Sequence, residues 1–145
     1  MPHLTLPITS GGPVLDLLVG VSRPRADALR RAGSPIPQPV SIRGLIDTGA
    51  SCTCIDPASL RSLGLSPTGR VPIHTPSTNE TPLDCEQYDV SLVLLHPKMQ
   101  LALGSLGVIA SNLEFHGIQA LFGRDVLGRC LFVYDSSAQV FALAF

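Results

Sequence analysis

Apolar and polar residues alternate with a period of two over several short stretches of this chain. The stretch 85–95 is the clearest, because Tyr88, Val90, Leu92 and Leu94 recur on one side of it. This period is typical of strands that bury one face. The same reasoning predicts strands at 3–8, 13–21, 40–46, 52–55, 71–75, 101–110 and 118–122, and in two arms of 130–145 that meet at a turn over 135–138. We therefore expect an all-β domain.

The pattern predicts only one or two short helices. In the segment DPASLRSLGL, Asp56 is a suitable N-cap, Pro57 fits the first helical position and Gly64 ends the helix. Leu60 and Leu63 would form its buried side. A second helix is expected to begin in GRDVLGR, with a carboxylate at position 125 as its cap.

The segment 22–39 interrupts the succession of strands and is predicted to be a surface insertion. Its first part is rich in arginine and allows a turn or two of helix around 27–31, and its second part is rich in proline. Glycine and proline are frequent elsewhere too, with thirteen of each in the chain. This frequency favours many tight turns between strands.

Length and charge narrow the classes of protein. The 145 residues, 45% of them apolar, suit one domain over 1–145 with a single core. The formal net charge is -1, and the basic residues are scattered apart from a loose arginine group at 23–31, so nucleic acid is not an expected partner. The opening segment MPHLTLPITSGG lacks the pattern of a secretory signal, and the uncharged run 99–113 is too short and too often broken by Gly and Ser to cross a membrane. We expect a cytoplasmic protein without a membrane partner.

The four cysteines have neither zinc-ribbon nor thioredoxin spacing. Cys52 and Cys54 would share one face of a strand, while Cys85 and Cys130 stand apart in sequence. Free thiols in a reducing compartment are expected, rather than disulfides or a metal site. The histidines also lack ligand spacing, although His74 falls near a predicted hairpin tip.

The segment GLIDTGAS ends an apolar run with an acid, Asp47. A carboxylate in such a place is costly to ionise unless hydrogen bonds or partner charges compensate it. If a second carboxylate lies within a few ångströms, the two share a proton and provide one acid and one base in a single site. Such a pair can activate a water molecule for attack on a peptide carbonyl.

Two separated motifs carry a resemblance to a known family. The segments LIDTGAS and ALFGRDVLGRCLFVYD resemble those of retropepsin-like aspartic peptidases, the single-domain group of retroviral proteases, ubiquitin-shuttle peptidases and their bacterial relatives. The resemblance covers the chain from about Val14 to its end. It implies a single-domain closed β-barrel or sandwich that is active as a two-fold dimer. It also implies that Asp47, Thr48 and Gly49 are catalytic and that no metal or organic cofactor is needed.

The chain does not supply a clear second member of the acid pair. Asp125 is most economically a helix cap, and Asp135 suits a hairpin turn and is followed by Ser137 where the motif requires glycine. A homodimer provides the second acid, because a two-fold axis through the site brings the two copies of Asp47 together. By resemblance, 130–133 and 140–145 would contribute strands to a sheet between the subunits, which would cover an apolar edge.

The residues beside the acid have expected roles. Gly49 allows the main chain to offer Asp47 an N–H without a side chain in the way. By resemblance, the Thr48 hydroxyl bonds the partner loop across the axis. Ala50 stands where two-lobed pepsins carry a hydroxyl that bonds the acid, so we expect a pH optimum less acidic than that of pepsin. Because Ser51 replaces the acid that pairs with arginine in retroviral proteases, Arg124 is expected to find another partner, such as Asp56.

The predicted hairpin 71–95 matches the family's flap, which closes over an extended peptide and pairs with its backbone. The expected substrate-binding residues are Ala50 beside the acid and five residues of the hairpin tip: Thr75, Pro76, Ser77, Thr78 and Asn79.

The leading prediction is an aspartic endopeptidase that hydrolyses extended polypeptides as a homodimer. Two alternatives stay open at this point. The same dimeric fold could be a non-catalytic module that binds peptides, with Asp47 kept as a structural acid, or the chain could be a self-processing part of a polyprotein.

Overall fold

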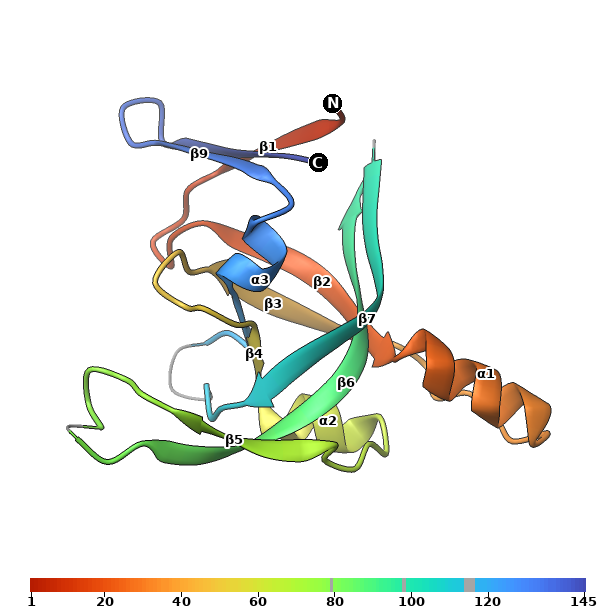
Figure 1. Cartoon of the computed structure of the whole chain (residues 1–145). Helices are drawn as coiled ribbons and strands as arrows, with labels where there is room; N and C mark the ends of the chain where they lie inside the picture. Colours follow the sequence, from red (N-terminus) through yellow and green to blue (C-terminus); the bar gives the residue numbers. More distant parts are fainter. Residues whose placement is uncertain (79, 98, 114–116) are drawn as a thin grey trace.

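The computed structural model describes residues 1–78, 80–97, 99–113 and 117–145, and it confirms a mostly β protein with short helices (Figure 1). The strands in these ranges are β1 (His3–Pro7), β2 (Val14–Val21), β3 (Val40–Ile46), β4 (Cys54–Ile55), β5 (Gly69–Ile73), β6 (Leu83–His96), β7 (Met99–Ala110), β8 (Ala120–Phe122), β9 (Leu131–Asp135) and β10 (Val140–Ala144). The helices are α1 (Arg23–Arg31), α2 (Pro57–Ser62) and α3 (Arg124–Leu127). No helix in these ranges has the length and apolar character needed to cross a membrane.

Six of the described strands close into a barrel in the order β2, β3, β8, β4, β7 and β6, since β6 pairs again with β2. Leu17 of β2 lies opposite Ile42 of β3 on one side and Leu94 of β6 on the other. Most neighbours are antiparallel, but β4 runs parallel to β7 and β8 runs parallel to β3. The β3–β8 pair brings the end of β3 beside the start of α3.

The alternating side chains of the strands fill the barrel. Tyr88, Val90, Leu92 and Leu94 of β6, predicted to share a buried face, are all buried in the core. Burial of each large apolar side chain stabilises the fold by roughly 1.5–3 kcal/mol. The period of two along this strand therefore identifies the side chains that point into the barrel.

The ends of the chain form a second, three-stranded sheet in the order β1, β10, β9 (Figure 1). Its inner side chains Leu4, Phe141 and Leu143 are fully buried. Strand β10 has a neighbour on each side, so within this sheet only the outer strands have an edge that a second subunit could extend. The outer edge of β9 has no neighbouring strand among the described residues.

Helix α2 forms as predicted. The carboxylate of Asp56 accepts a hydrogen bond of 3.0 Å from the Ala58 N–H, and Leu60 and Leu63 are fully buried. Gly64 follows with φ of +65°, a conformation that glycine adopts without strain. The N-cap, the buried leucine pair and the terminating glycine could all be predicted, because each depends only on residues close by in the sequence.

Helix α1 is longer than the turn or two predicted within 22–39. Ser22 caps it, with its Oγ accepting a 3.4 Å bond from the Arg25 N–H, and Pro24 occupies its first turn. None of its residues is buried, and it projects away from the barrel (Figure 1). Because a helix of this length is marginal on its own, its serine cap contributes to its stability.

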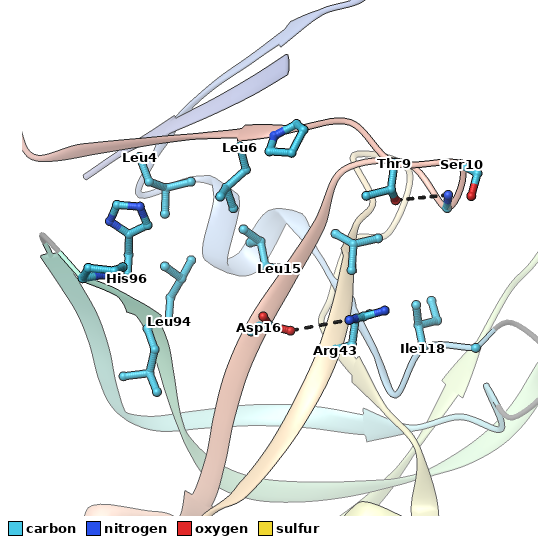
Figure 2. Close-up of a pocket in the computed structure, with 16 residues that line it drawn as sticks. Leu4, Leu6, Thr9, Ser10, Leu15, Asp16, Arg43, Leu94, His96 and Ile118 are labelled. Carbon is cyan, nitrogen blue, oxygen red and sulfur yellow. Dashed lines mark hydrogen bonds and ion pairs between the residues drawn. The ribbon is translucent and has the colours of Figure 1, made fainter. Parts of the chain in front are cut away.

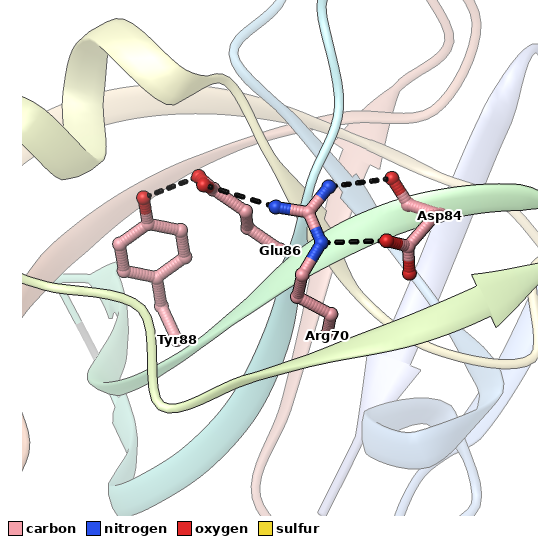
Figure 3. Close-up of polar contacts among 4 residues, drawn as sticks. All are labelled: Arg70, Asp84, Glu86 and Tyr88. Atoms are coloured by element: carbon pink, nitrogen blue, oxygen red, sulfur yellow. Dashed lines mark hydrogen bonds and ion pairs between the residues drawn. The ribbon is translucent and has the colours of Figure 1, made fainter.

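Strands β5 and β6 form the predicted hairpin, which begins two residues earlier than expected because Gly69 and Arg70 also pair with β6. Figure 3 shows the polar contacts that stabilise this end of the hairpin. The Arg70 guanidinium contacts the carboxylates of Asp84 at 2.6 Å and Glu86 at 3.5 Å. Glu86 in turn accepts a 2.9 Å bond from the Tyr88 hydroxyl.

Candidate active site

Asp47 is the first residue after β3, and the fold fixes its main chain. Its N–H donates to the carbonyl of Phe122 in β8 at 3.1 Å, which continues the parallel pairing by one step. Its carbonyl accepts from the Ala50 N–H at 3.2 Å and closes a tight turn. The side chain is half-buried. The acid therefore stands at the end of a core strand rather than on a free loop.

Gly49 makes the main-chain contact expected for it. Its N–H donates to Asp47 Oδ1 at 2.9 Å. A Cβ at this position would lie 3.1 Å from the same oxygen, so a side chain would crowd the carboxylate. Thr48, between them, is exposed at the tip of the turn.

Arg124 holds this turn from the other side. Its Nη1 donates to the Thr48 carbonyl at 2.9 Å, and its main-chain N–H donates to the Ala50 carbonyl at 2.9 Å. The expected partner Asp56 is wrong, because the carboxylate of that residue accepts from the N–H groups of Ala58 and Leu113. Arg124 therefore bonds the main chain of the turn, and this contact does not require the acid that Ser51 replaces.

The prediction that Asp125 caps a helix is also wrong. The N-cap of α3 is Gly123, and Asp125 reaches back to Thr53. Its carboxylate accepts 2.8 Å and 2.9 Å bonds from the hydroxyl and N–H of Thr53, which is fully buried. The same hydroxyl accepts a 3.1 Å bond from the Gly123 N–H. One buried hydroxyl thus ties the segment after Asp47 to the start of α3.

Sequence reasoning missed Thr53. The one available signal was a hydroxyl residue in an otherwise apolar run before Ile55, a place where an unpaired hydroxyl would be costly. Gly123 has an equally strict place, since a Cβ there would lie 2.5 Å from the main-chain carbon of Cys52. Only glycine allows this close approach.

A cavity of about 380 Å³ lies between the Asp47 turn and the hairpin. Asp47, Gly49 and Ala50 line it from the turn, and Thr75 and Pro76 line it from the hairpin tip. The remaining walls are mainly apolar and include Ile73, Leu83, Ile109 and Leu121. The structure therefore brings two predicted groups of residues, far apart in sequence, to one apolar cavity.

Other predicted tip residues lie differently. Ser77 and Thr78 do not line the cavity, and their hydroxyls bond within the tip, to the Thr75 hydroxyl at 2.9 Å and the Thr75 carbonyl at 2.9 Å. Asn79 lies outside the described residues. His74, noted for its sequence position, does line the cavity.

A larger cavity, of about 590 Å³, lies between β1, β2 and the end of β6 (Figure 2). Its carboxylate, Asp16, already has a cationic neighbour in Arg43 at 3.9 Å. By volume alone the larger cavity would be the candidate active site, but the residues of the smaller cavity suit catalysis better. Of these two cavities, only the smaller combines an acid at the end of a core strand with an N–H aimed at the acid.

Among the residues that line the smaller cavity, Asp47 carries the only carboxylate. Asp125 is bonded to Thr53, and Asp135 accepts bonds from Ser137 and Ala138 in the turn between β9 and β10. A second acid therefore does not come from the described part of the same chain. Nor do the described ranges contain three His, Cys, Asp or Glu residues grouped to hold a metal ion.

Comparison with known proteins gives structural neighbours only. No family model and no curated protein matches the sequence. A retropepsin-like aspartic protease from Rickettsia conorii superposes with a TM-score of 0.58 at 16% identity, over 99% of this chain and 91% of that one. The retroviral protease-like domain of Ddi1 from Leishmania major gives a TM-score of 0.41 at 13% identity, over 86% and 82% of the two chains. The first of these likenesses, together with the closed barrel and the turn that follows β3, identifies the retropepsin-like fold in this chain.

Proposed function

We propose that this protein is an aspartic endopeptidase that hydrolyses peptide bonds in extended polypeptides as a homodimer. One observation carries the proposal. Asp47 lies at the end of a core strand, accepts the Gly49 N–H at 2.9 Å, and lines an apolar cavity that the β5–β6 hairpin also lines. An acid held in this way next to a hairpin and an apolar cavity suits cleavage of a peptide that lies between them.

The second acid comes from a second copy of Asp47 across a two-fold axis. Two carboxylates at close range share one proton, so one accepts a proton from water while the other protonates the peptide carbonyl oxygen. The exposed hydroxyl of Thr48 then reaches the partner's turn, and Arg124 keeps both turns in register through the Thr48 carbonyl.

The outer edge of β9 is the surface that we assign to the dimer. Leu131, Val133 and Tyr134 of this strand are 58%, 47% and 52% exposed, which is unusual for large apolar side chains in a row. An apolar strand with an open edge readily pairs with another strand. Pairing of β9 with its copy would cover these side chains.

The substrate class follows from the hairpin and the cavity. An extended peptide between Asp47 and the hairpin can pair its backbone with the tip and place an apolar side chain among Ile73, Leu83 and Leu121. We assign the protein to the cytoplasm, because its four cysteines are free, as in a reducing compartment.

The test compares wild type and Asp47→Asn on a mixed peptide library, with cleavage products read by mass spectrometry. The amide keeps the shape and removes the base, so cleavage should fall by at least about hundredfold. Asp16→Asn is the matched control, since it removes a carboxylate from the larger cavity and should leave cleavage unchanged. Equal cleavage by wild type and Asp47→Asn would end the proposal.

A non-catalytic peptide-binding module is the second candidate. The observation in its favour is the hairpin tip, which is closed by bonds of 2.9 Å between the Thr75 main chain and the Thr78 hydroxyl and therefore has a fixed shape. Saturable binding of peptides without turnover from acid to neutral pH would decide for this candidate.

A further inference from the structure

Three of the four cysteines line the cavity beside Asp47. Cys52 and Cys54 come from the segment after the acid, and Cys85 comes from β6 of the hairpin. The fourth, Cys130, does not line this cavity, and its thiol contacts the Val126 carbonyl at 3.6 Å. The chain therefore contains a thiol cluster at the candidate site and one thiol away from it.

The strand geometry explains why Cys52 and Cys54 lie together. Thr53, between them, turns its side chain into the core toward Asp125, so its two neighbours face the opposite side. The Cys54 thiol leans back along the chain and donates to the Cys52 carbonyl at 3.8 Å. Both residues line the cavity beside Asp47.

The thiols also influence one another. Burial, the nearby Cys52 and, more weakly, Cys85 together raise the pKa of Cys54 to about 12. Burial likewise raises the pKa of Cys85. A raised pKa keeps a thiol protonated and makes it a poor first nucleophile toward a peroxide. We therefore place the first step at Cys52, which lies on the bend before β4.

We propose that Cys52 and Cys54 form an oxidation site through which a hydroperoxide inactivates the cavity reversibly. The Cys52 sulfur attacks a peroxide oxygen, the O–O bond breaks, and the distal oxygen leaves as water or an alcohol, which gives a sulfenic acid. The Cys54 thiol then gives up its proton to the leaving oxygen as its sulfur attacks the Cys52 sulfur, so the S–O bond breaks, a disulfide forms and water leaves. The two thiols lose two electrons, and the peroxide takes them.

The disulfide acts on the site through the main chain. The Cys52 backbone packs against Gly123 without room for a single extra carbon. A movement at Cys52 therefore displaces Gly123 and, with it, the neighbouring Arg124 that holds the Thr48 and Ala50 carbonyls. The Asp47 turn loses its support, and the cavity changes shape at the same wall.

The experiment treats reduced full-length protein with hydrogen peroxide and maps its cysteines by mass spectrometry without reduction. Binding of a fluorescent statine-containing peptide and cleavage of the peptide library are measured in parallel. A Cys52–Cys54 link should form, and peptide affinity should fall by at least about tenfold and return with dithiothreitol. Cys54→Ser should form no such link and should bind the peptide equally before and after peroxide, and Cys130→Ser should behave as wild type.

The proposal is overturned if Cys52 and Cys54 stay reduced, if the link forms to Cys85 instead, or if the link leaves peptide affinity unchanged. If Cys54→Ser does not fold, Cys52→Ser replaces it with the same expected result. The regulatory part rests on the proposed function, but the link and the binding are read without turnover. A chain that never cleaves peptides, yet loses affinity on oxidation, would refute the peptidase and support the oxidation site.

Discussion

Gly123 and Thr53 show how single residues outside the acid motif hold the acid in place. The Thr53 hydroxyl accepts a hydrogen bond from the Gly123 N–H and donates one to Asp125. Gly123 packs so closely against the Cys52 main chain that a Cβ would not fit. Neither residue lines the cavity with Asp47. They contribute by fixing the Asp47 turn through close-packed contacts on the side away from the cavity.

We predict that Gly123→Ala destabilises the protein. The added carbon would lie 2.5 Å from a main-chain atom that cannot move independently, so we expect a loss of about 1–3 kcal/mol in the free energy of unfolding. Urea denaturation measures it. Gly69→Ala is the matched control, because a Cβ at Gly69 meets nothing within 4 Å. Equal midpoints for the two variants would contradict the packing argument.

The sequence predicted those contacts of the site that are local and missed those that are not. The Gly49 N–H and Asp47 are two positions apart, so the motif itself implies their bond. Asp125 and Thr53 are 72 positions apart, and no local rule pairs them, so the carboxylate was assigned to the nearest helix instead. Arg124 was assigned to a side chain, although the Thr48 carbonyl is its partner.

Among the elements, the β5–β6 hairpin lines the cavity, and Arg70 ties its two strands together. The hairpin was predictable from its alternation, but its start was not. Gly69 and Arg70 join the strand because of an ionic contact across it, which a period of two does not report. The start of α1 was also missed, because the helix was expected around 27–31 and Ser22 was not recognised as its cap.

We predict that Arg70→Ala loosens the hairpin without unfolding the barrel. The contacts of Arg70 with Asp84 and Glu86 are exposed, so the effect should be local and should shrink as salt increases. Hydrogen exchange of the β5 and β6 amides measures it. Arg30→Ala removes a similar exposed pair from α1 and should leave this exchange unchanged. Faster exchange across the whole barrel in Arg70→Ala would refute a local role.

A second element, the β9–β10 turn, responds to acid. The Ser137 side chain and the Ala138 N–H lower the pKa of Asp135 by bonding its carboxylate. This contribution to stability is present above the pKa of the unfolded chain and is lost as pH falls through the lower folded value. We predict that the acid-side loss of stability is smaller in Asp135→Asn than in wild type, as measured by urea denaturation from pH 6 to about 2. Asp16→Asn serves as the control, and identical pH profiles for wild type and Asp135→Asn would contradict the assignment.

At the scale of the whole molecule, the account requires two copies. The described chain has a complete barrel and a complete apolar cavity but one carboxylate in that cavity, together with an apolar open edge at β9. The sequence predicted the fold class, which the structure confirms, and a homodimer, which stays a prediction. It did not predict that β10 is enclosed on both sides and that β1 and β9 form the edges of this sheet, since that depends on how the two ends of the chain meet.

We predict that Val133→Glu shifts the protein from dimer to monomer and lowers cleavage per subunit. A charge placed on the β9 edge would face its own copy across the axis. Sedimentation at micromolar concentration measures the shift. Leu95→Glu, a similar change at a 48% exposed leucine on β6, should leave the dimer intact. A Val133→Glu protein that stays dimeric would place the interface elsewhere.

The most direct test of the shared acid pair mixes wild type with Asp47→Asn subunits at constant total protein, after full exchange. If each site needs Asp47 from both copies, equal parts of the two proteins should leave about a quarter of the wild-type activity, because about one dimer in four then carries both acids. Activity of about one half, in proportion to the wild-type subunits present, would contradict the account, because each chain would then work alone.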